Sequence, residues 1–526
     1  MCEANMTKTF LSGTTALLTT IFVLGTVAET ASAQSIALEE IVVTARKREE
    51  NLQDVPLAIT ALTATDFERR SISDLEGIAN YTAGLNFEDF STTFNGALTI
   101  RGLVQADIQN RVQNVAVFLD GAYVPRNYSI DIGLIDLARV EVVKGPQSSL
   151  YGQNAFAGAL NYVTRQPSMT DYEANGTVTV GTDGRLDYKA ALGVPLVEDK
   201  FAIRGSYGRS EFDGNRKNDF PNVSKRLSKV GGYERESFNI GFLATPVEEL
   251  RIDAMYMETK KEAEVRPGYT VSGNTAAIQH NCGPAIPGLG TPSFYCGEIP
   301  DTADSFQSAT STRPSGILFP DQPGASTDTR FMRAGIAYDI NDDFLVEYKI
   351  SDVDAEATEV SGLPDNPLSG FFTFQKEGGI NDFQSHEVRI AYEPADGPLS
   401  AEIGYYNAEA DDAFVFALGF AVGNPNLVIT NPTSGILDLT GLPIPLRNFT
   451  VDEGTDAVFG SVRYSFAEDR ARLSVEGRQS WVDVSFFDNV ANLVPQESKF
   501  SNFTPRFTAE YDVSEDTLIY VSAAKG

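Results

Sequence analysis

From about Tyr172 onward, apolar and polar side chains alternate along segments that are joined by short and long connections in turn. In the segment 200–210, Phe201, Ile203 and Tyr207 alternate with polar or small residues. The same pattern returns in the segments 250–259, 342–351 and 471–480. Each segment therefore has one apolar and one polar face, over about the 9–11 residues that a tilted strand needs to cross a bilayer.

The connections differ on the two sides of these strands. Short turns are expected at 195–199, 245–249, 340–343, 393–398, 467–470 and 513–516, and long Gly-, Pro- and Asp-rich stretches at 212–234, 262–327, 356–381, 412–453 and 486–499. This asymmetry is typical of an outer-membrane β-barrel. A soluble β-sandwich is the alternative, but it would pack its apolar faces into a core and rarely needs such long loops. The pattern predicts roughly 13 strands; closed single-chain barrels have even numbers, so we expect a partial barrel.

Composition limits the other classes. The formal net charge is −31, which argues against a nucleic-acid partner because phosphate binding needs clustered Lys and Arg. Beyond the N-terminus the sequence has no apolar run of 18 residues, so a membrane would be crossed by strands and not by helices.

The N-terminus resembles a secretion signal. Lys8 precedes an apolar stretch, Phe10–Val27, and Ala31-Ser32-Ala33 supplies a cleavage site. We therefore expect a signal peptide at 1–33, with a transmembrane anchor as the weaker alternative. Because the first residues are acidic, translation from Met6 instead of Met1 stays open.

Residues 55–167 have the composition of a mixed α/β domain. Two helices are expected there, the first capped by Thr65 with Glu68 and the second by Ser73 with Glu76. Strands are expected in Gly96–Leu103, in Asn114–Pro125 with a turn at Asp120-Gly121, and on both sides of the Gly145-Pro146 turn.

Cys282 and Cys296 share a Gly- and Pro-rich segment of an exported chain, which favours a disulfide between them. A metal site is the alternative. It would need more ligands than these two residues and the nearby His280, so no metal is expected.

Several motifs resemble those of the TonB-dependent outer-membrane receptors. "EEIVVTA" at 39–45 is similar to the TonB box, and "IRGL" at 100–103, "VAVFLDGAYVPR" at 115–126 and "ARVEVVKGPQSSLYGQNAFAGALNYVTRQP" at 138–167 are similar to the plug motifs. The third plug motif is long and specific. It departs from the family pattern at Ala159, where the family often has Gly.

The resemblance implies the following architecture. A 22-stranded barrel of a Gram-negative outer membrane would be filled by the plug at 55–167, with 34–54 as TonB box and flexible tether and 168–526 as a C-terminally truncated part of the barrel. The box residues would be Glu39, Glu40, Ile41, Val42, Val43, Thr44 and Ala45. The plug-motif residues would be Arg101, Gly102, Asp120, Gly121, Glu141, Lys144, Gly145, Pro146, Tyr151, Gly152, Gly158, Thr164 and Arg165.

On this basis the box is expected to be an unpaired strand that adds to a sheet edge of TonB by main-chain hydrogen bonds. The charged run after it is expected to be a solvated tether. The charged plug residues are expected to pair with one another or with inward-facing barrel charges such as Arg204, Arg251, Glu347 and Glu476.

No catalytic constellation is present: the two His residues, His280 and His386, are far apart, and no hydrolase, nucleotide-binding or metalloprotease motif occurs. We expect no enzyme activity, no catalytic residue and no cofactor.

The resemblance implies active uptake of a scarce nutrient, with a ferric siderophore as the leading cargo. Oligosaccharide, aromatic compound and cobalamin are the alternatives, and a passive porin or adhesin-type barrel is the alternative class. Expected partners are TonB, outer-membrane lipid and the nutrient. The nutrient would contact the plug at Val104–Gln113 and Pro125–Ser129 and would also contact the long loops. The receptor is expected to be a monomer.

Overall fold

The fold is that of a computed structural model. It describes residues 41–44, 47–48, 50–89, 96–103, 113–214, 216–217, 229–263, 281–285, 292–295, 324–362, 371–395, 397–422, 447–489, 494–514 and 517–525. The chain divides into two units, Met1–Ile41 and Val42–Gly526, and all elements described belong to the second. Within the described ranges no helix is both long and apolar enough to cross a membrane.

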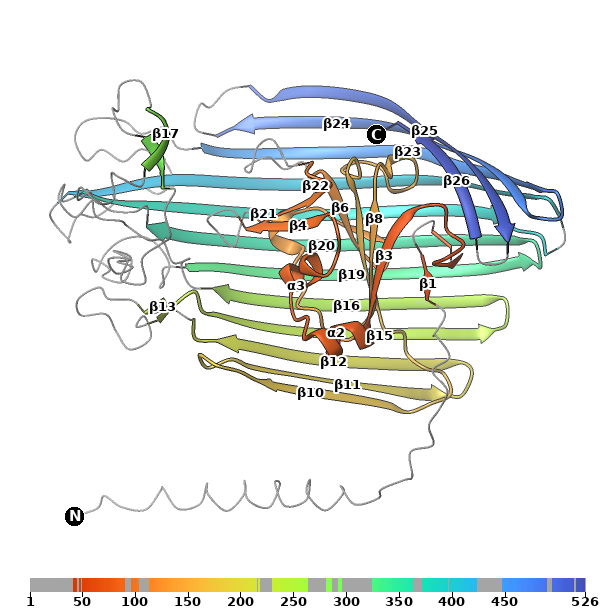
Figure 1. Cartoon of the computed structure of the whole chain (residues 1–526), viewed down its shortest axis with the longest axis horizontal. Coiled ribbons are helices and arrows are strands. Elements are labelled where there is room, and N and C mark those ends of the chain that lie inside the picture. Colours follow the sequence, from red (N-terminus) through yellow and green to blue (C-terminus); the bar gives the residue numbers. More distant parts are fainter. Residues whose placement is uncertain are drawn as a thin grey trace, which may run out of the picture. The chain divides into compact units, whose positions relative to one another are not determined.

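A single sheet of 13 antiparallel strands makes up most of the described structure. Its strands are neighbours in chain order, and Figure 1 shows them side by side from β10 in yellow to β26 in blue. They are β10 (Glu173–Val180), β11 (Leu186–Val197), β12 (Phe201–Phe212), β15 (Tyr233–Val247), β16 (Leu250–Ala263), β19 (Gly324–Asn341), β20 (Phe344–Gly362), β21 (Phe371–Tyr392), β22 (Leu399–Val422), β23 (Arg447–Phe466), β24 (Ala471–Asp488), β25 (Gln496–Ser514) and β26 (Thr517–Ala524). The predicted number of strands is confirmed.

Many of these strands are longer than predicted. β22 has 24 residues and β21 has 22, against about 9–11 needed to span a bilayer. Parts of the stretches expected as long loops, 356–381 and 412–453, therefore lie in strands. The prediction was wrong there because it followed side-chain alternation, whereas the ladder is made by backbone groups and continues through acidic segments such as Asp411–Asp412.

In the large sheet, apolar side chains are exposed and charged side chains are buried, the reverse of a soluble protein. In β24, Leu473 and Val475 are about half exposed (50% and 48%), whereas Glu476 and Arg478 are buried at 3% each. Exposed apolar side chains continue on the neighbouring strands, for example Val462 at 49%. An exposed apolar face with a charged face turned inward is what a lipid-facing strand requires.

The N-terminal part of this unit forms a small α/β domain, the plug. Its elements are β1 (Val42–Val43), β2 (Glu50–Asn51), β3 (Ala58–Thr63), α2 (Ala64–Arg70), α3 (Leu75–Asn80), β4 (Leu85–Asp89), β5 (Gly96–Ile100), β6 (Val115–Leu119), β7 (Ala122–Val124), η1 (Asn127–Ser129), β8 (Leu137–Lys144), α4 (Ser148–Tyr151) and β9 (Gly158–Thr164). Five strands form a sheet in the order β3-β8-β9-β6-β7, with β6 and β9 parallel. Two short ribbons, β13 (Arg216–Lys217) with β14 (Lys229–Val230) and β17 (Asn281–Ala285) with β18 (Pro292–Tyr295), lie between strands of the large sheet in the sequence.

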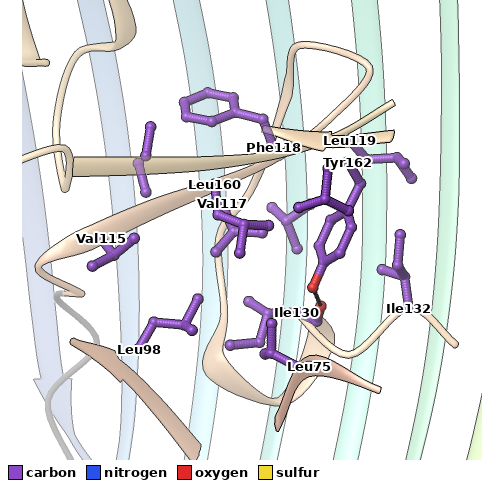
Figure 2. Close-up of a cluster of buried hydrophobic side chains, with 14 of the residues drawn as sticks. Leu75, Leu98, Val115, Val117, Phe118, Leu119, Ile130, Ile132, Leu160 and Tyr162 are labelled. Carbon is purple, nitrogen blue, oxygen red and sulfur yellow. Dashed lines mark hydrogen bonds between the residues drawn. The ribbon is translucent and has the colours of Figure 1, made fainter. Parts of the chain in front are cut away.

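The plug has its own apolar core. Val117 of β6 and Leu160 of β9 are fully buried, and Leu75 of α3 packs into the same cluster. Figure 2 shows Tyr162 pointing toward Ile130, whose carbonyl oxygen accepts a hydrogen bond from the tyrosine hydroxyl at 3.0 Å. A buried tyrosine with a satisfied hydroxyl fixes the segment after η1 against the sheet.

Both helices are present, but their caps differ from the prediction. α2 is capped by Thr63 with Asp66 in a capping box, two residues before the expected Thr65. α3 is capped by Asp74, which accepts from the Gly77 N–H at 2.8 Å, and not by Ser73. The cap of α2 lies at Thr63 because of a contact far away in the sequence. β3 pairs with β8 up to Thr63, so the chain leaves the sheet there and the helix begins at the next residue.

Candidate functional site

The segment Val42–Thr44 is fastened to the plug. Val42 and Val43 pair with Asn51 and Glu50 in a small antiparallel ribbon, and Val43 is fully buried. The Thr44 N–H donates to Oε1 of the buried Glu141 at 2.9 Å, and its hydroxyl lies 3.2 Å from both oxygens of the same carboxylate. The expected unpaired strand is therefore wrong for Val42 and Val43. Glu39, Glu40 and Ala45 lie outside the described residues.

The residues after this segment lie against the large sheet. Lys47 forms an ion pair with Glu387 of β21 at 2.5 Å, and its ammonium lies 4.4 Å from the Phe459 ring centre. The Lys47 carbonyl accepts from Arg389 at 2.7 Å, and Glu50 lies 3.6 Å from Arg463. The expectation of a solvated tether is wrong for Lys47 and Glu50, because charged residues of the sheet hold them, whereas Gln53 and Asp54 are exposed.

Plug carboxylates pair with cations of the large sheet. Asp136 makes a two-pronged bond to Arg204, at 2.5 and 2.7 Å, and both side chains are buried. Asp131 pairs with Arg235 and, at 3.0 Å, with Lys261. Two-pronged Arg–carboxylate pairs fix orientation as well as distance.

The charge of Asp131 depends on its partners. Burial raises the pKa of Asp131, but Arg235 and Lys261 outweigh this effect and hold the pKa below its usual range. The aspartate therefore stays ionised beside the two cations, and the pair fastens the plug at ordinary pH.

A third attachment surrounds α4. Arg506 of β25, buried at 2%, donates to the carbonyl of Pro146 and, at 2.7 Å, to the Gln147 side chain. The Ser149 hydroxyl donates to Glu476 at 3.1 Å, and Glu476 lies 3.2 Å from Arg506. This turn of the plug is thus tied to β24 and β25.

Gly152, which ends α4, allows the Arg478 side chain of the large sheet to approach the plug closely. Gly152 has φ +86° and ψ −143°, a conformation almost confined to glycine. A Cβ there would lie 3.0 Å from Cζ of Arg478 and 3.1 Å from its Nη2. Glycine at this position lets β24 place a guanidinium against the plug.

The remaining plug-motif residues stabilise turns and the plug itself. Asp120 and Gly121 both have positive φ, 49° and 79°, in the hairpin between β6 and β7. The Asp120 carboxylate accepts from the N–H and hydroxyl of Thr164, at 2.8 and 2.7 Å. A hairpin turn with two positive φ angles fits the predicted Asp-Gly pair.

Three charged residues of the plug motif, Glu141, Lys144 and Arg165, have partners inside the plug. Glu141 bonds to Arg139 at 2.7 Å, Arg165 lies 3.9 Å from Asp136, and Lys144 donates to Thr60 at 2.9 Å. Burial and the neighbouring Arg101 lower the pKa of Lys144. Of the four sheet residues named as possible partners, Arg204 and Glu476 bond to the plug, Glu347 pairs with Arg389 in the sheet, and Arg251 is exposed.

Other candidate residues are described only in part. Cys282 lies in β17, and Cys296 lies outside the described residues, so the disulfide stays a prediction. The same holds for most of the expected ligand segment, 104–112. In the second expected ligand segment, Arg126 is bonded to Asp412 of β22, with Nε at 2.6 Å from Oδ1.

Sequence reasoning missed Asp131, Asp136 and Lys47. The first two had a signal: they interrupt the apolar run 130–137 with carboxylates that an apolar environment tolerates only when paired. Lys47 had none, because a lysine in a charged run is usually solvated.

Two family models match the chain. Residues 51–159 match the TonB-dependent Receptor Plug Domain, and residues 285–526 match the TonB dependent receptor-like β-barrel. Among curated proteins, the pesticin receptor of Yersinia pestis is 26% identical over 236 residues, covering 41% of this chain and 33% of that protein. The ferrioxamine receptor of Yersinia enterocolitica is 29% identical over 154 residues, covering 26% and 21%.

Solved structures show the same fold. The ferric yersiniabactin uptake receptor FyuA of Yersinia pestis superposes with a TM-score of 0.63 at 16% identity, over 89% of this chain and 64% of that one. The ferric-catecholate import receptor Fiu of E. coli K12 superposes with a TM-score of 0.64 at 14% identity, over 91% and 70%. The chain spans a third or less of the length of the curated relatives named above.

Proposed function

The chain belongs to the TonB-dependent outer-membrane receptors, and from that premise we propose that it imports a ferric siderophore with energy delivered by TonB. Its domains would be a signal peptide at 1–33, box and tether at 34–54, plug at 55–167 and barrel from 168 onward. TonB would bind Glu39–Ala45. A relative named as a ferrioxamine receptor, and solved structures named as ferric yersiniabactin and ferric-catecholate receptors, support an iron chelate as cargo.

The observation that carries this proposal is the way Val42–Thr44 is attached. The segment is extended, precedes the plug directly and is bonded to strand β8 through Thr44 and Glu141. Among the described residues, two pairs, Val42–Asn51 and Val43–Glu50, hold it in its ribbon. A partner strand that paired along all seven residues of Glu39–Ala45 would make more main-chain hydrogen bonds, each worth about 1 kcal/mol net. The segment can therefore exchange its ribbon for a TonB strand and transmit a pull to the plug.

The test is deletion of Glu39–Ala45 from the intact receptor. Uptake of a radioiron-labelled siderophore should fall to the level of cells that lack TonB, while binding of the same chelate at the cell surface is retained. Replacing Ser35–Leu38 by glycine and serine is the matched control and should leave uptake unchanged. Undiminished uptake by the deletion variant would refute TonB dependence.

The cargo is tested separately by transcript abundance. Strong induction under iron starvation supports a ferric siderophore. Induction by a sugar or an aromatic compound, without an iron response, would replace iron by a carbon source and leave the energised mechanism in place.

A further inference from the structure

A cavity of about 850 Å³ lies between the plug and the large sheet. Asp120 and Arg165 line it from the plug, and Arg333 and Arg478 line it from the sheet. Exposed residues such as Gln153 also belong to the lining, so solvent reaches the space. Among the described residues, the expected ligand segment Pro125–Ser129 contributes none to the lining.

The cavity lining carries an excess of positive charge, whereas the chain as a whole is negatively charged. Of the residues that the structure describes, nine Lys or Arg and five Asp or Glu line the cavity, whereas the whole sequence has 41 and 72. The cations are Lys47, Arg48, Arg139, Arg165, Arg251, Arg333, Lys349, Arg389 and Arg478. In a chain of net charge −31, an excess of cations around one cavity favours an anionic occupant.

Most of these cations have carboxylate partners; Arg478 does not. Its side chain is 3% exposed, and among the described residues no carboxylate oxygen lies within 4.0 Å of its guanidinium. Glu387, the carboxylate that acts on it electrostatically, is bonded to Lys47 at 2.5 Å. A buried charge without a counter-ion is costly, so it is rarely kept without a role.

The surroundings hold the Arg478 guanidinium in place without neutralising it. Its central carbon lies 5.0 Å from the Tyr406 ring centre and 5.6 Å from that of Phe459. Nε donates to Ser480 at 3.1 Å, and Gly152 leaves room for the guanidinium. The two Nη groups have no hydrogen-bond partner among the described residues, and the residue lines the cavity.

We propose that this cavity binds an anionic ligand through a carboxylate group held by Arg478. The guanidinium fork matches a carboxylate geometrically, and Ser480, Thr504 and Asn502, which also line the cavity, supply uncharged polar groups beside it. Given the transport function proposed above, the site is a stage on the path of an acidic iron chelate past the plug.

Citrate is the probe, because it is small and carries three carboxylates. Titration calorimetry of the intact purified receptor should show citrate binding that trimethyl citrate does not reproduce. Arg478→Gln should weaken it by at least about tenfold. Arg472→Gln is the matched control: it lies on the same face of β24 but is paired with Glu510 and Asp512 outside the cavity, and citrate affinity should be unchanged. Equal citrate affinity of the wild type and Arg478→Gln, or no binding by the wild type, would overturn the proposal.

A second measurement does not alter Arg478. With Gln153→Cys, a thiol reagent should modify the new cysteine more slowly when citrate is present, as read at that residue by mass spectrometry. An unchanged rate would count against the site. Neither experiment needs TonB or an energised cell, so failure of the uptake proposal and failure of this one are distinguishable.

Discussion

Thr44 and Glu141 lie 97 residues apart in the chain, yet the Thr44 N–H donates to Oε1 of Glu141 at 2.9 Å. The carboxylate is fully buried on β8, and Arg139 beside it balances its charge at 2.7 Å. The end of the proposed TonB box is thus bonded directly to the sheet of the plug.

Replacing Glu141 should free the box without unfolding the plug. In Glu141→Ala, Thr44 loses hydrogen bonds to a charged acceptor, each worth about 1.5–3 kcal/mol. Amide exchange of the peptide that contains Ile41–Thr44 should accelerate by at least about tenfold. Glu76→Ala, an exposed carboxylate on α3, is the control and should exchange as the wild type does. Equal exchange in both variants would show that Glu141 does not hold the box.

The ion pair between Lys47 and Glu387 should compete with TonB binding. In the wild type, Lys47 and Glu387 form an ion pair at 2.5 Å. Lys47→Glu puts a second carboxylate beside Glu387, and the repulsion between the two should displace the segment around residue 47 from β21. Affinity for the purified C-terminal domain of TonB should rise by about 5- to 30-fold, corresponding to about 1–2 kcal/mol.

The exchanged pair is the control for this prediction. Lys47→Glu combined with Glu387→Lys restores opposite charges and should return the affinity toward the wild-type value. If the single and double variants bind TonB equally, the ion pair has no part in holding the segment.

Acid should loosen the plug through Asp131. Because Arg235 and Lys261 lower its pKa below 3.8, its contribution is complete above pH 3.8 and is lost as the pH falls through the lowered value. Pepsin cleavage within the plug should therefore rise steeply below pH 3.8. Asp131→Asn should be cleaved faster at pH 5 and show a smaller rise on acidification, whereas Asp171→Asn, at an exposed carboxylate, should follow the wild type. Identical pH profiles of the wild type and Asp131→Asn would contradict this role.

Gly152→Ala should destabilise the plug more than an equivalent change elsewhere. Its backbone conformation is unfavourable for alanine, and the added Cβ would meet Arg478 at 3.0 Å, so a loss of about 2–3 kcal/mol is expected. Gly102→Ala is the control, because Gly102 has φ +75° but no atom within 4 Å of an added Cβ, and about 1 kcal/mol is expected. Thermal unfolding of the intact receptors gives the comparison, and equal losses would mean that Arg478 yields to the methyl group.

The large sheet could be predicted because its signal is local and repeated. Side chains two residues apart share a face, so Leu473 and Val475 already show which face of β24 is apolar. The cap of α2 was ambiguous locally: Thr63 with Asp66 and Thr65 with Glu68 have the same spacing. The pairing of β3 with β8 decided between them, and a single sequence does not contain that contact.

The attachment of the plug could not be predicted for a related reason. Asp136 and Arg204 are 68 residues apart, and Lys47 and Glu387 are 340 apart. Each partner is one of many charged residues in an acidic chain, and no periodicity links them. Each pair forms only because the plug lies against the large sheet in the folded chain.

The antiparallel ribbon of β1 and β2 has a mechanical consequence. The chain enters β1 at the open end of the ribbon, so a pull from the amino end loads the Val42–Asn51 pair first and the Val43–Glu50 pair only after the first has parted. Thr44 on Glu141 and Lys47 on Glu387 come next in the same order. Bonds that are loaded one at a time separate like a zipper and yield at lower force than the same bonds loaded together in shear. The ribbon of β1 and β2 can therefore separate at low force. The charged attachments of the plug to the large sheet remain in place while it does so.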